Sequence, residues 1–84
     1  MKFEIAEIEE IIVGQLNNHN ITYNDIVTCT DEGKLLEIIE VVNAGMKDFS
    51  LSFTLDKFLY NEFILLSCHN IKLIINKFYL NVIL

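Results

Sequence analysis

The last third of the sequence, residues 58–84, constrains the fold more than any other stretch. Eighteen of its 27 residues are apolar, and Glu62, Lys72 and Lys77 are its only charged residues. Asparagines and charges interrupt the stretch regularly, whereas a membrane-spanning helix needs about 20 nearly unbroken apolar residues. We therefore expect this stretch to form the core of one folded domain, residues 1–84, and we expect no membrane contact.

Charge is distributed unevenly along the chain. Residues 1–56 hold eleven of the twelve acidic residues, and the chain contains no arginine. Nucleic-acid binding draws on clustered lysine and arginine, so we expect no direct contact with nucleic acid. An acidic surface speeds encounter with basic proteins. The charge pattern therefore predicts a larger basic protein as the partner.

The candidate contact residues are acids of the first half of the chain. Two of them align on one side of a predicted N-terminal helix, and the others lie in or after a predicted turn. The predicted partner-binding residues are Glu7, Glu10, Asp31, Glu32 and Glu37.

The first half of the chain predicts one helix and two strands. Residues 3–17 place isoleucine and leucine on one stripe of an amphipathic helix. Residues 26–30 are short and β-branched, and residues 31–33 offer a turn that ends in glycine. Residues 34–42 are rich in isoleucine and valine, which favours a strand. A helix from Asp31 as N-cap to Gly45 as C-cap is the alternative.

The second half predicts a strand, a short helix and a hairpin. Residues 49–55 alternate apolar and small polar side chains, the period of a half-buried strand. Residues 56–66 suit a second helix, although a helix ending at Tyr60 and a strand over 63–68 is an alternative. Residues 71–75 and 78–84 form the hairpin, across Asn76 and Lys77.

These elements predict an α+β fold, in the order α-β-β-β-α-β-β, with an antiparallel sheet of about five strands. The last hairpin is apolar on both faces, with Ile74, Tyr79 and Ile83 on the second one. That second face needs a cover, which could be the N-terminal helix, a second copy of the chain or a partner protein.

Catalytic and metal chemistry find little support in the sequence. Cys68 and His69 are adjacent on a strand and point to opposite faces, so they do not form a dyad. Cys29 could meet His69 or His19 in space, but no spacing predicts it. The two cysteines and two histidines lack the short-range pairs of structural zinc sites. We predict no enzyme activity, no catalytic residue, no metal and no cofactor.

The function that we expect is that of a small acidic inhibitor or regulator. Thirteen isoleucines, nine asparagines and no arginine are typical of AT-rich coding DNA, which fits a phage or mobile element. Lys2 is followed by an acid-rich segment, which favours the cytoplasm over secretion. The alternative is a self-assembling module that dimerises through its C-terminal β-hairpin.

Overall fold

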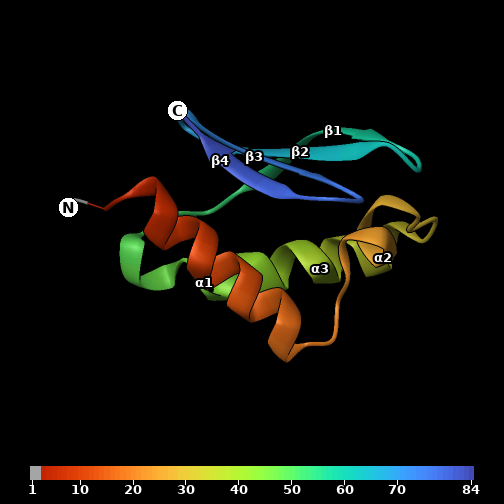
Figure 1. The fold of residues 1–84 in the computed structure, drawn as a ribbon, viewed down its shortest axis with the longest axis horizontal. Helices are drawn as coiled ribbons and strands as arrows, with labels where there is room; N and C mark the ends of the chain where they lie inside the picture. Colours follow the sequence, from red (N-terminus) through yellow and green to blue (C-terminus); the bar gives the residue numbers. More distant parts are fainter. Residues whose placement is uncertain (1–2) are drawn as a thin grey trace.

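A layer of helices packs against one face of an antiparallel sheet in the computed structural model, which describes residues 3–84 (Figure 1). This confirms the predicted α+β class, with four strands in the described residues in place of about five. The strands follow one another in space as they do in the sequence, and each pairs antiparallel with the next. The elements are α1 (Ile5–Asn18), α2 (Tyr23–Val27), α3 (Glu32–Ala44), the 3₁₀-helix η1 (Lys47–Phe49), β1 (Thr54–Leu59), β2 (Phe63–Cys68), β3 (Ile71–Asn76) and β4 (Leu80–Ile83).

Helix α1 confirms the predicted N-terminal helix. Its buried residues Ile8, Ile12 and Leu16 belong to the predicted stripe and face the core. Gln15 fixes α1 against α3, because its side-chain amide donates a hydrogen bond of 2.9 Å to the carbonyl oxygen of Val41. The two helices therefore meet near the C-terminal end of each helix.

Helix α3 corrects the predicted strand over residues 34–42. Its buried side chains recur at the i, i+3, i+4 and i+7 positions of a helix face, which outweighs the β propensity of isoleucine and valine. The Asp31 carboxylate accepts a hydrogen bond from the Lys34 N–H, so Asp31 is the N-cap that the alternative named. The buried positions are Leu35, Ile38, Ile39 and Val42.

The strand predicted over 26–30 is wrong, because helix α2 ends at Val27 and residues 28–30 form a turn and a short link. Thr22 and Asp25 form a capping box, in which each side chain accepts a hydrogen bond from the backbone N–H of the other residue. This box starts a helical turn that places the consecutive residues Ile26 and Val27 in the core. A half-buried strand would point two such neighbours to opposite faces.

The predicted strand over 49–55 is also wrong, since β1 begins at Thr54. Phe53 lies in the core, but the side chain of Asn43 replaces a neighbouring strand as its hydrogen-bond partner. The Phe53 N–H donates to Asn43 Oδ1 at 2.7 Å, and Asn43 Nδ2 donates to the Phe53 carbonyl at 2.9 Å. Ser50, with a φ of 56°, turns the chain after η1. The alternation of apolar and small polar residues over 49–55 was therefore not sufficient to predict a strand.

Residues 56–66 form no helix, and the predicted second helix is wrong. They belong to the β1–β2 hairpin, whose turn contains Asn61 at a φ of 63°. The Asn61 N–H also donates a hydrogen bond of 2.7 Å to the carbonyl of Val27, which ties the turn to the end of α2. Glu62 lies exposed in this turn. Strand β2 matches the alternative strand over 63–68.

The last hairpin is confirmed, as β3 and β4, joined by residues 77–79. Asn76 shapes that turn, because its side-chain oxygen accepts hydrogen bonds from the N–H groups of Phe78 and Tyr79. Alternate residues of β2, β3 and β4 point toward the helices and complete the core. These residues are Ile64, Leu66, Cys68, Ile71, Leu73, Ile75, Leu80 and Val82.

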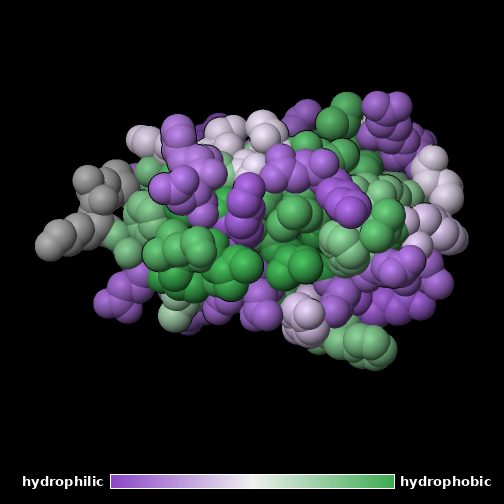
Figure 2. Space-filling view, turned by 90° about the horizontal axis from the view of Figure 1, so that it is seen from above, coloured by the Kyte–Doolittle hydropathy of each residue, from purple (hydrophilic) through white to green (hydrophobic). Residues whose placement is uncertain are grey.

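The opposite face of the sheet, here called the outer face, is left open by the helices. Helix α1 packs against β4, and all the helices of residues 3–84 lie on the same side of the sheet (Figure 1). Helix α1 therefore does not provide the cover considered from the sequence. Apolar side chains gather across the middle of the outer face, with polar ones between and around them (Figure 2).

Candidate functional site

The five predicted contact acids are all exposed, but they do not form one cluster. Glu7 and Glu10 lie on α1, whereas Asp31 and Glu32 lie at the far end of α3 from the contact between the two helices. Glu32 precedes Val41 by nine residues, which is about 14 Å along a helix axis. Glu7 and Glu10 are therefore separated from the acids at the start of α3.

A groove of about 600 Å³ lies between α3 and the segment that contains α2. Two of the predicted acids, Asp31 and Glu37, line it, together with Asp25, which was not among the predicted contact residues. Glu32 borders a different hollow of about 490 Å³, which also contacts β1 residues. The groove is lined by residues 19–21, Asp25, residues 28–31, Lys34, Glu37, Ile38 and Val41.

One wall of the groove is formed by residues that cap α2 and α3 and by the link between these helices. The capping box of Thr22 and Asp25 starts α2, and the Asp31 N-cap starts α3 after a short link. Within that link, the Cys29 thiol donates a hydrogen bond of 3.3 Å to the carbonyl of Asp31. Because the same hydrogen bonds that define the helix ends hold this wall, Asp25 and Asp31 have fixed positions beside the groove.

The groove has an acidic rim and an apolar part. Hydrogen bonds from the backbone and side chain of Thr22 hold the pKa of Asp25 below its ordinary range, so this carboxylate stays ionised at neutral pH. Lys34 is the one lysine that lines the groove, against Asp25, Asp31 and Glu37. Isoleucine and valine side chains supply the apolar surface: Ile21, Ile38 and Val41.

The outer face of the sheet is the second candidate surface. Leu59, Phe63, Leu65 and Ile74 are half-buried on it, and Ile83 at its end is 53% exposed. Neither Phe63 nor Leu65 was predicted from the sequence to lie on a face that the helices leave uncovered. The continuous apolar run of residues 63–66 could have revealed them, since successive residues of a strand point to opposite faces of the sheet.

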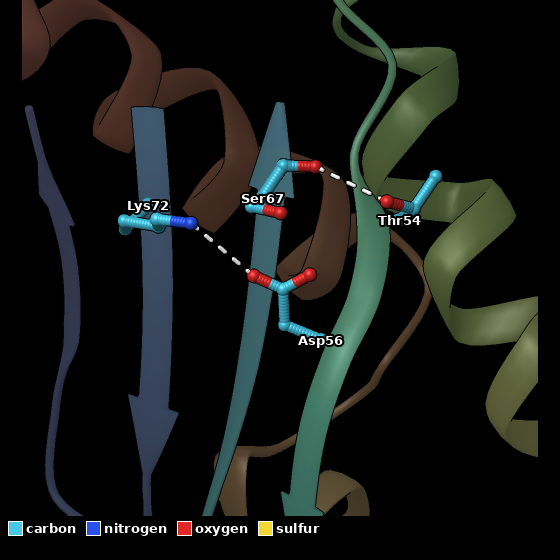
Figure 3. A network of polar contacts seen from close by, with 4 residues as sticks. All are labelled: Thr54, Asp56, Ser67 and Lys72. Carbon is cyan, nitrogen blue, oxygen red and sulfur yellow. Dashed lines mark hydrogen bonds and ion pairs between the residues drawn. The ribbon is translucent and has the colours of Figure 1, made fainter. Parts of the chain in front are cut away.

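A polar network crosses one end of the outer face (Figure 3). Lys72 Nζ lies 3.3 Å from Asp56 Oδ2, and the Thr54 hydroxyl lies 3.5 Å from the carbonyl oxygen of Ser67. The Ser67 hydroxyl, and then the neighbouring Lys72, lower the pKa of Asp56 below its ordinary range. The network therefore carries one positive and one negative charge on this face.

In the described part of the chain, the cysteines and histidines form no catalytic pair. Cys68 is buried in the core, and His69 is exposed in the β2–β3 turn at a φ of 55°. Cys29 and His19 both line the groove, but His19 Nδ1 bonds the carbonyl of Gln15 and the Cys29 thiol bonds Asp31. Within residues 3–84, no three His, Cys, Asp or Glu side chains are grouped to hold a metal ion.

No protein-family model, curated protein or solved structure matches this chain. Among the residues that the structure describes, no helix has the length and apolar character needed to cross a membrane. The two surfaces described above are therefore the basis for any functional conclusion.

Proposed function

We propose that this chain is a non-enzymatic protein-binding domain, an inhibitor or regulator that holds a basic segment of a larger protein in the groove between α2 and α3. One observation carries the proposal: three carboxylates, from Asp25, Asp31 and Glu37, line a groove that has Lys34 as its one lysine. Such a field attracts cationic side chains and repels phosphate backbones.

The groove also suits the shape of a basic side chain. Lysine and arginine have a long apolar stem and a charged head, and they bury the stem along apolar surface. Ile21, Ile38 and Val41 offer that surface, and the carboxylates offer partners for the head. We infer that one or two lysine or arginine side chains of the partner enter the groove.

Glu7 and Glu10, the predicted contacts on α1, act at longer range in this proposal. They do not line the groove, but they add to the negative potential that steers a basic partner toward the helical layer. Glu32 lies beside Asp31 at the start of α3 and acts in the same way.

We further propose a cytoplasmic inhibitor of the kind that a phage or mobile element encodes, with a nucleic-acid-processing enzyme as its target. The absence of arginine and the many isoleucines and asparagines support that source. Both cysteines are free thiols, which supports a reducing compartment.

The test compares charge reversal inside and outside the groove. Glu37→Lys changes a groove residue, and Glu40→Lys makes the same charge change on α3 outside the groove. Binding of a short lysine- and arginine-rich peptide is measured by fluorescence anisotropy. We expect Glu37→Lys to weaken binding about tenfold and Glu40→Lys to weaken it less than threefold. Equal losses of peptide affinity in the two variants, or no saturable binding of the peptide by the unchanged protein, would refute the proposal that the groove binds a basic segment.

Salt provides a second readout on the same peptide. Binding that depends on ion pairs at an exposed groove weakens as ionic strength rises, because salt screens the charges. We expect the affinity of the unchanged protein to fall with added sodium chloride. Affinity independent of salt would contradict an electrostatic groove.

A further inference from the structure

We propose that the outer face of the sheet is a homodimer interface, on which a second copy of this chain packs its own outer face. Each face carries apolar side chains that the helices leave uncovered: Leu59, Phe63, Leu65, Ile74 and Ile83. Exposed apolar patches of this kind mark interaction sites in soluble proteins. This surface lies across the sheet from the helical layer, so the inference is independent of the groove.

Pairing through the sheet edges is disfavoured at both edge strands. At β4, the Val82 N–H already donates a hydrogen bond of 2.8 Å to the Glu9 carboxylate. At β1, the register shifts between Leu55 and Lys57, which makes a bulge at Asp56. Bulges and charged side chains are devices that prevent edge-to-edge association. Two copies can then associate through the faces of their sheets. This makes the alternative predicted from the sequence, dimerisation through the C-terminal hairpin, more specific.

Charge favours a second copy over a basic protein on this face. Residues 54–84 carry three lysines and two acids, whereas residues 3–53 carry ten acids and two lysines. Two copies that meet through their outer faces keep their acidic helical layers apart. Around a two-fold axis, Lys57 or Lys72 of one copy can also approach Asp56 of the other.

The outer face also has a hollow and a protruding side chain beside it. A hollow of about 460 Å³ is lined in part by Phe63, Ile74 and Tyr79. Phe78, which is 87% exposed, borders that hollow from the β3–β4 turn. In a two-fold dimer each copy presents the same surface to the other. The Phe78 ring of each copy can therefore enter the hollow of its partner.

The size of the face predicts a weak, reversible dimer. With a strand spacing of about 4.8 Å and a rise of about 3.3 Å per residue, three strands of six residues and one of four cover roughly 350 Å². Stable interfaces bury about 800 Å² of each partner. We therefore expect a dissociation constant of roughly tens to hundreds of micromolar.

Sedimentation equilibrium of the protein alone tests this interface. The average mass should rise from that of the 9.7 kDa chain toward twice that value as concentration increases. Ile74→Lys on the outer face should raise the dissociation constant at least tenfold. Leu36→Lys is the matched control, because Leu36 is 52% exposed on α3 in the helical layer. Leu36→Lys should change the dissociation constant of the dimer by less than twofold.

Phe78→Ser provides a variant that does not threaten the fold, since this side chain is almost fully exposed. It should weaken the dimer at least threefold. Added salt should strengthen the dimer, because each copy is acidic overall and salt reduces the repulsion. A monomer at millimolar concentration, or equal effects of Ile74→Lys and Leu36→Lys, would overturn the proposal. Peptide binding in the groove has the opposite salt dependence, so each proposal can fail without the other.

Discussion

The carboxylate of Glu9 accepts a hydrogen bond of 2.8 Å from the backbone N–H of Val82, although the two residues are 73 positions apart in the sequence. Glu9 lies on α1 and Val82 on the edge strand β4, so this bond joins the helical layer to the sheet. It also occupies an edge N–H that would otherwise be open to another strand. One glutamate thus contributes to both the packing of the monomer and the protection of its edge.

Replacing Glu9 tests that bond. Glu9→Ala should lower the free energy of unfolding by about 1 kcal/mol, because the Val82 N–H loses its acceptor. Glu9→Gln keeps an acceptor oxygen and should cost less. Hydrogen exchange of the Val82 amide gives the site-specific readout, with faster exchange in Glu9→Ala than in Glu9→Gln. Unchanged exchange of this amide in both variants would show that the bond is not formed in solution.

Asn43 is expected to be the most sensitive polar residue of the helix-to-sheet connection. Its side chain pairs with both backbone groups of Phe53, whose own side chain is 1% exposed. Asn43→Ala leaves a donor and an acceptor without partners and should cost about 2 kcal/mol. Asn17→Ala, at an exposed position of α1, should stay within about 0.5 kcal/mol. Urea denaturation measures both, and similar losses in the two variants would contradict the assigned role.

Two glycines should respond to alanine with opposite signs. A Cβ on Gly14, inside α1, meets no atom within 4 Å, so Gly14→Ala should stabilise the domain by about 0.5–1 kcal/mol. A Cβ on Gly45 would lie 2.7 Å from Gln15 Cγ and 3.0 Å from Ile11 Cγ2. Gly45→Ala should therefore destabilise the domain by about 1–2 kcal/mol. Thermal unfolding measures both, and stabilisation by Gly45→Ala would mean that α1 and α3 do not approach there.

Acid should remove the stabilising contribution of Asp56. Ser67 and Lys72 lower its pKa in the folded state, so the contribution is present at neutral pH. It is lost as pH falls from about 4 through the folded-state pKa. The difference in unfolding free energy between the unchanged protein and Asp56→Asn should thus shrink on acidification. Ser67→Ala should raise the pKa of Asp56, measured by NMR titration of its carboxyl group. An unchanged pKa would refute this interaction.

The parts of the fold that the sequence predicted correctly are those with one dominant signal. The N-terminal helix has a long apolar stripe, and the last hairpin has two short apolar runs around a polar turn. The errors came where two signals competed. In residues 34–42 the helix pattern and the Asp31 cap outweighed β-branched residues, and at Phe53 a single asparagine side chain replaced a neighbouring strand.

The candidate surfaces were less predictable than the fold class, because they depend on which segments meet. Asp25 reaches the groove only because its capping box with Thr22 turns residues 23–27 into a helix. The spacing of Thr22 and Asp25 is that of a capping box, and it could have predicted the start of that helix. The open outer face depends instead on all helices packing on one side of the sheet, which no single segment determines.

We expect the two sides of this domain to bind different partners: a basic segment in the groove and a second copy on the outer face. Amide chemical shifts from ¹⁵N–¹H correlation spectra test this most directly. Titration with the basic peptide should shift groove residues such as Cys29, Glu37 and Val41, whereas concentrating the protein alone should shift Leu65, Ile74 and Phe78. If the peptide shifted the outer-face residues, or if concentration shifted none of them, the separation of the two surfaces would be contradicted.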